Sequence, residues 1–128
     1  MISGGARHTM RIDHVAVDAP KLDETVQWYI KQFGASVLYQ DATWAFLKVG
    51  GSKLALLTPG QHPPHIAFAV TDIELEQLAG QQNQVIKAHR DGTRSFYTAD
   101  PSGNPVEFIS YPPGNAYEST PERPGVQP

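Results

Sequence analysis

The chain has 128 residues, a net charge of −3 and no cysteine. This length suffices for one domain with a hydrophobic core, and the missing cysteines exclude disulfides, thiolate metal sites and a cysteine nucleophile. Without a run rich in lysine and arginine, we expect no nucleic acid and no anionic membrane among the partners. No apolar run approaches the roughly 18 residues of a membrane span, and residues 1–10 lack a secretory core, so we expect a soluble, cytoplasmic protein.

The first half of the chain predicts a strand, a helix and three more strands. Residues 11–18 favour a strand, and the helix that follows carries apolar residues at helical spacing. Pro20 suits the first turn of this helix, and Gly34 is placed to end it. Strands are predicted at 36–40, 43–49 and 53–58, with a hairpin turn at the glycines between the last two.

The second half predicts the same order of elements. Residues 65–70 favour a strand, and Asp72 is expected to cap a short helix. Strands follow near 84–89, 94–99 and 105–111, and residues 100–104 (DPSGN) are a strong turn signal between the last two.

The two halves can be superimposed in sequence, which predicts an internal duplication. His65 lies 51 positions after His14, and the offset of 52 between Gly51 and Gly103 carries Ala55 onto Glu107. We therefore expect an α+β fold with a flexible N-terminus at 1–10, a folded region at 11–111 made of modules at about 11–60 and 64–111, and a Pro-rich tail at 112–128.

Three residues at these repeated places form a candidate metal site. His14 and His65 share the pattern His-apolar-Ala, and Glu107 interrupts an apolar strand, where an unpaired carboxylate is costly to bury. Two imidazoles and one carboxylate can bind Zn, Mn, Fe or Ni and leave coordination positions open. Either histidine alone is more often a hydrogen-bonded structural residue, and Glu107 could face solvent if the strand is half exposed.

The chain resembles the vicinal oxygen chelate superfamily, which includes glyoxalase I, fosfomycin-resistance proteins, bleomycin-resistance proteins and extradiol dioxygenases. The resemblance covers about residues 11–111 and rests on three segments, which are Ile12–Ala16, His65–Phe68 and Ser95–Glu107. It implies two βαβββ modules that form an incomplete barrel around a divalent metal, with His14, His65 and Glu107 as ligands. It also implies a homodimer, and in some members the metal site combines modules of two subunits.

The sequence departs from particular branches of this superfamily at two alanines. The glyoxalase I branch has a fourth acidic ligand, which also moves protons, where this chain has Ala55. Thiol-transferring fosfomycin-resistance proteins bind the antibiotic with a threonine where this chain has Ala16. The pattern of two histidines and one glutamate is similar to the fosfomycin-resistance and dioxygenase branches.

These features together predict a metal-dependent lyase, transferase or dioxygenase that acts on a small substrate chelated through adjacent oxygens. Tyr97 is the candidate catalytic residue, as a phenol that donates a hydrogen bond to an oxyanion, and His62 or His89 could also take part. Trp44 and Phe46 alternate on a strand and could form an aromatic wall for an apolar substrate, although core packing explains them equally well. Arg94 could pair with an anionic substrate or lie at a solvated strand edge. Two alternatives keep the fold: a bleomycin-resistance-like protein that sequesters a small molecule without turnover, and a structural or regulatory domain with a vestigial site.

Overall fold

The structure is a computed structural model, and it describes residues 10–114. The elements of the first half are β1 (Arg11–Asp18), α1 (Leu22–Phe33), β2 (Ser36–Gln40), β3 (Trp44–Val49) and β4 (Ser52–Leu57). Those of the second half are β5 (His65–Ala69), α2 (Asp72–Gln82), β6 (Lys87–Ala88), β7 (Arg94–Ala99) and β8 (Pro105–Ser110). The predicted order of strand, helix and three strands, given twice, is therefore confirmed.

Within the described region, eight strands form one open sheet in the order β2-β3-β4-β1-β5-β8-β7-β6. β1 pairs with β4 and β5 pairs with β8, both in parallel, while β1 and β5 pair with each other antiparallel. The pairing of β1 with β5 is thus the seam between the two halves. The sheet does not close on itself, which agrees with the predicted incomplete barrel.

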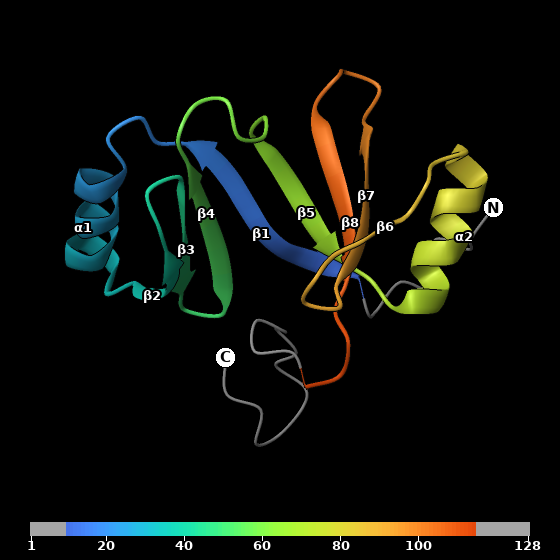
Figure 1. The fold of residues 1–128 in the computed structure, drawn as a ribbon, viewed down its shortest axis with the longest axis horizontal. Coiled ribbons are helices and arrows are strands. Elements are labelled where there is room, and N and C mark those ends of the chain that lie inside the picture. Colours follow the sequence, from blue (N-terminus) through green and yellow to red (C-terminus); the bar gives the residue numbers. More distant parts are fainter. Residues whose placement is uncertain (1–9, 115–128) are drawn as a thin grey trace.

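The two helices lie at opposite ends of the molecule, each packed on the strands of its own half (Figure 1). Leu22 and Val26 of α1 pack against Ala45, Leu47 and Leu56 of β3 and β4. Because side chains alternate along a strand, the neighbours of these residues in β3 and β4, such as Phe46 and Ala55, point to the opposite face of the sheet. That opposite face carries the candidate site.

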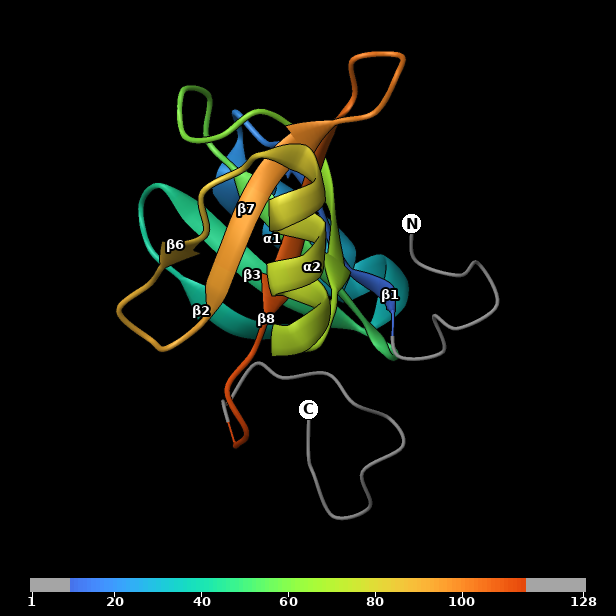
Figure 2. The ribbon, with the colours of Figure 1, turned by 90° about the vertical axis from the view of Figure 1, so that its right-hand side faces the viewer.

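In the second half, α2 lies beside β7 and β8 (Figure 2). Leu75 and Ala79 of the helix pack with Phe96 of β7 and Phe108 of β8. Phe96 and its neighbour Tyr97 therefore divide between the faces of the sheet, with Phe96 in the core under α2. Within residues 10–114 no helix is both long and apolar enough to cross a membrane.

Some predicted details were wrong. The N-cap of α2 is Thr71, whose side chain accepts a hydrogen bond from the backbone N–H of Glu74, and Asp72 is the first helical residue. α1 begins at Leu22 after Lys21, so Pro20 precedes the helix. The strand predicted near 84–89 is reduced to Lys87–Ala88. Of the terminal segments, residues 1–9 and 115–128 lie outside the described residues.

Candidate metal centre

The repeated His-apolar-Ala pattern is explained by the seam between β1 and β5. In the antiparallel register His14 lies opposite Ala67, and His65 lies opposite Ala16. Each imidazole thus faces a methyl group, which leaves room for both rings on one face of the sheet. The ring centroids of His14 and His65 are 5.5 Å apart, with an angle of 75° between the ring planes.

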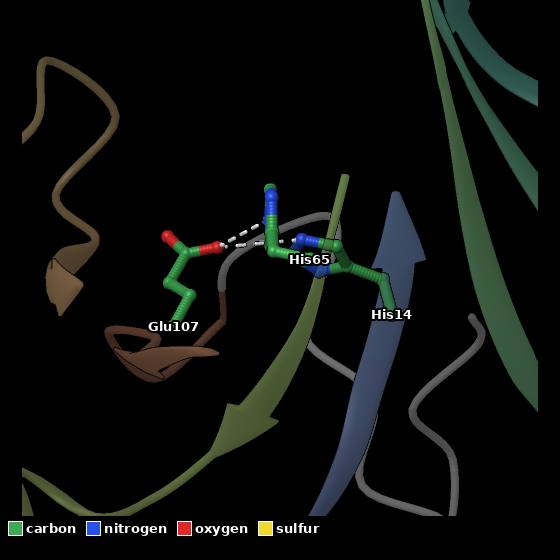
Figure 3. A group of neighbouring side chains, drawn as sticks. All are labelled: His14, His65 and Glu107. Atoms are coloured by element: carbon green, nitrogen blue, oxygen red, sulfur yellow. Dashed lines mark ion pairs between the residues drawn. The ribbon is translucent and has the colours of Figure 1, made fainter. Parts of the chain in front are cut away.

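Glu107 reaches the same place from the neighbouring strand β8. It pairs with Ala67 of β5, just as Ala55 of β4 pairs with Ala16 of β1. The sheet register therefore bears out the equivalence of Ala55 and Glu107 that the sequence offsets predict. One ligand atom from each of His14, His65 and Glu107 lies within 4.8 Å of the others, and all three residues are buried (Figure 3).

The hydrogen bonds around the two histidines suit a cation at this point. His14 Nδ1 lies 2.7 Å from the carboxylate of Asp13, and His65 Nδ1 lies 3.0 Å from the carbonyl oxygen of Pro63. Both partners are acceptors, which assigns the proton of each neutral ring to Nδ1 and leaves the lone pair on Nε2. Each Nε2 then points at Glu107 Oε1, at 3.4 and 3.2 Å.

With both rings neutral, two imidazole nitrogens and a carboxylate oxygen thus converge, and all three are hydrogen-bond acceptors with no N–H or O–H between them. His65 Nε2 is buried and forms no well-aligned hydrogen bond. A buried polar atom without such a bond is costly unless an ion or a proton satisfies it. Two imidazole nitrogens and a carboxylate oxygen are a suitable ligand set for a divalent transition metal. The residues present thus fit the metal that the sequence predicts.

The ionisation of the cluster reflects the same convergence. Burial alone would raise the pKa of Glu107, but hydrogen bonds and charges from His14 and His65 outweigh it and lower this pKa to about 2. Burial likewise disfavours the charged form of His14, yet its bonds to Asp13 and Glu107 raise its pKa to about 8. In the metal-free protein below about pH 8, the ring of His14 thus gains a second proton, on Nε2, which faces the Glu107 carboxylate.

A buried network behind His14 was not predicted from the sequence. A β-bulge in β1 between Ile12 and His14 allows the side chains of Asp13 and His14 to meet, although neighbours in a regular strand point apart. Asp13 also pairs with Lys53 Nζ at 2.9 Å and accepts a hydrogen bond of 2.7 Å from the hydroxyl of Tyr111. Asp13 is only 2% exposed. The alternation of side chains along a regular strand does not predict the contact of Asp13 with His14, because the bulge depends on the pairing of β1 with β5.

A cavity of about 430 Å³ is lined by the three cluster residues and extends from them across the sheet. Tyr97 and His62 line it on the side of the second half. The ring of Tyr97 stands perpendicular to that of His65 at 5.2 Å and is stacked with the ring of His62 at 6.1 Å. Burial and the adjacent carboxylate of Glu107 raise the pKa of Tyr97, so its phenol keeps its proton.

The other sequence candidates divide between the cavity and the outer surface. Trp44 and Phe46, whose alternation on one strand suggested an aromatic wall, both line the cavity. His89 instead contacts Ser95 through its Nε2, at 2.9 Å. Arg94 pairs with Asp72 and Glu76 of α2. His8 lies outside the described residues.

Comparison with known proteins identifies the family of this chain. A sequence model of the Glyoxalase/Bleomycin resistance protein/Dioxygenase superfamily matches residues 11–108, which is most of the chain. The chain belongs to this superfamily. Members of this superfamily use divalent metals, and His14, His65 and Glu107 are a possible site for one.

Individual relatives of this superfamily member are distant. The metallothiol transferase FosB of Lysinibacillus sphaericus is 27% identical, over 76% of this chain and 79% of the relative. Methylmalonyl-CoA epimerase from Mycobacterium tuberculosis has the same fold, with a TM-score of 0.64 and 19% identity over 84% of this chain and 91% of the other. A superfamily member from Vibrio splendidus gives a TM-score of 0.62 and 16% identity, over 79% and 98% of the two chains. Similarity at this level establishes the fold, and two of these relatives are named as enzymes.

Proposed function

We propose that this protein is a divalent-metal-dependent enzyme that acts on a small substrate chelated through two adjacent oxygens. One observation carries the proposal: three buried ligand atoms from His14, His65 and Glu107 lie within 4.8 Å of one another on the wall of a cavity. A divalent ion held there would supply Lewis acidity to a substrate with two neighbouring oxygen atoms. Three protein ligands leave further coordination positions for the substrate.

The remaining chemistry falls to side chains on the cavity wall. Tyr97 is the proposed catalytic residue, because its protonated phenol can donate a hydrogen bond from Oη to a substrate oxygen that gains negative charge. His62 stacks on Tyr97 and limits the space on that side. Ala55 lies where a fourth acid would stand, and its methyl group cannot move a proton. A proton transfer would therefore depend on Tyr97, His62 or water.

The competing proposal is a protein of the same fold that sequesters a small molecule without turnover. The family includes bleomycin-resistance proteins, and the cavity beside the cluster could hold a small molecule without a reaction. The buried ligand set favours the enzyme, since a binding protein that needs no metal gains nothing from three converging donors. The three candidate ligands lie close together within one chain, and a homodimer remains a prediction.

Metal binding is the first experiment. Purified protein is stripped with a chelator, loaded with Zn²⁺, Mn²⁺, Fe²⁺ or Ni²⁺ in separate samples, desalted and analysed for metal content. We expect about one equivalent of at least one metal. His14→Ala and Glu107→Ala should each abolish this binding, whereas the control His89→Ala should keep it, because His89 is bonded to Ser95 away from the cluster. Protein that binds none of the four metals, or binding that survives both cluster variants, would contradict the proposal.

Turnover then separates the enzyme from the sequestering protein. Metal-loaded protein is assayed with catechols, with adducts of 2-oxoaldehydes and thiols, and with fosfomycin plus a thiol. Metal-dependent turnover of any of these that is lost in Glu107→Ala supports the enzyme. Tight binding of a bulky ligand that persists after the metal is removed supports sequestration.

A further inference from the structure

One wall of the cavity is apolar and comes from the first half of the chain. It consists of Ala16, Trp44, Phe46, Ala55 and Leu57, from β1, β3 and β4. The strand register sets these side chains on one face, because Phe46 lies opposite Ala55 and Trp44 lies opposite Leu57. The two alanines add no bulk beside the cluster, so the aromatic side chains are the main surface that a ligand would meet here.

This wall begins directly at a metal-ligand candidate. The ring of Phe46 meets the ring of His14 edge to face at 5.6 Å. Trp44 continues from Phe46, with ring centroids 5.5 Å apart, and is supported on its other side by Tyr39 at 5.3 Å. A ligand anchored at the cluster through two oxygens would therefore place its remaining atoms beside aromatic rings, which favour flat apolar groups.

The charged residues around the cavity limit the charge of the ligand that it can bind. Among the described residues that line it there is no lysine or arginine, while Asp91 and Glu107 are acidic. The nearby Lys53 does not line the cavity and forms an ion pair with the buried Asp13, at 2.9 Å. A divalent ion carries two positive charges, and the carboxylates of Glu107 and Asp91 offset both. A ligand with two or more negative charges would thus find no second cation to neutralise it.

We propose that the substrate of this site is an aromatic or similarly flat apolar molecule with two adjacent oxygens and no more than one negative charge. This inference rests on the proposed function and narrows it. Trp44 and Phe46 form the subsite that selects the apolar group. Substrates that carry phosphate groups or several carboxylates are disfavoured, because the described cavity wall offers them no basic side chain.

Matched chelators test the subsite by isothermal titration of zinc-loaded protein. Benzohydroxamate and acetohydroxamate share one chelating group and differ in a phenyl against a methyl group, and oxalate is a small dianion. Each affinity is divided by the affinity of the same chelator for free Zn²⁺. We expect benzohydroxamate to exceed acetohydroxamate by roughly tenfold or more, because its ring is removed from water, and oxalate to bind more weakly than benzohydroxamate.

A pair of tryptophan variants locates the effect. Trp44→Leu should reduce the preference for the phenyl group to about twofold or less. Trp28→Leu is the matched control, because Trp28 is 52% exposed on α1, on the face away from the cavity, and should leave the preference unchanged. Normalised oxalate affinity equal to that of benzohydroxamate, or a phenyl preference that survives Trp44→Leu, overturns the inference. If Trp44→Leu does not fold, the wild-type comparison of the three chelators decides.

The two levels of the proposal fail differently. Wild-type protein that binds none of the four metals tested above overturns the proposed function together with this inference, and if zinc alone fails to bind, the titrations use the protein loaded with the metal that does. Zinc-loaded protein that binds all three chelators in proportion to their affinity for free zinc overturns the inference alone.

Discussion

The buried ion pair behind the cluster makes a quantitative prediction about folding. Asp13 is 2% exposed, Lys53 is 6% exposed, and their charged atoms are 2.9 Å apart. Burial raises the pKa of Asp13, but the hydrogen bond from His14 and the charge of Lys53 outweigh it, so the pKa lies below its usual value and Asp13 is ionised. Asp13→Asn removes this charge and leaves Lys53 in the interior without it. Loss of one partner of a buried pair costs about 3–5 kcal/mol, a large part of the roughly 5–15 kcal/mol that stabilises a domain.

Urea unfolding followed by circular dichroism measures the effect, with metal-free protein so that metal affinity does not contribute. The double variant Asp13→Asn with Lys53→Met is the control, because it leaves no unpaired lysine charge in the interior. We expect the double variant to recover most of the loss. A cost below about 1 kcal/mol for Asp13→Asn would equal that of a surface pair and refute the reasoning. Equal stability of the single and double variants would refute it as well.

Three further predictions concern pH, the missing acid and the helix cap. In the metal-free protein His14 holds a second proton below its pKa of about 8, and zinc must displace that proton. The affinity of the protein for zinc should therefore fall as the pH is lowered from about 8 to 6. Calorimetry in two buffers of different ionisation enthalpy counts the released protons, and a pH-independent affinity would contradict this prediction. Ala55→Glu places a carboxylate at the position equivalent to Glu107 and should bind zinc roughly tenfold tighter, or about 1.4 kcal/mol, in a chelator competition, while unchanged affinity would show that the position is not equivalent. Thr71→Ala removes the hydroxyl that accepts a hydrogen bond from the backbone N–H of Glu74 and should lower the free energy of unfolding by about 1 kcal/mol in urea, whereas Asp72→Ala, at the cap expected from sequence, keeps this bond.

The sequence was sufficient for the fold and for the members of the cluster. Strand alternation, helical spacing and turn residues depend on neighbours in the chain, and these placed nearly every element. The two offsets near 51 and 52 then aligned Glu107 with Ala55, and the pairing of β5 with β8 repeats that of β1 with β4. Whether the cluster residues bind metal, and whether Tyr97 is catalytic, stay predictions until measured.

Features that depend on tertiary pairing could not be predicted in this way. Asp13 adjoins His14 in sequence, and strand parity would place its side chain on the other face. Its two further partners, Lys53 and Tyr111, come from distant parts of the chain, so their meeting depends on the completed sheet. The same holds for the stacking of His62 on Tyr97, which joins the linker between the halves to β7.

The position of the cluster on the seam has a consequence for mechanical integrity. His14 belongs to the first half and His65 to the second, and β1 and β5 are the strands by which the halves are joined. An ion bound by both histidines would cross-link β1 and β5 and oppose any displacement of one half relative to the other. By linkage, an ion at one hundred times its dissociation constant adds about 2.7 kcal/mol to stability. Removal of the metal should therefore loosen the junction first, which amide hydrogen exchange along β1 and β5 would detect.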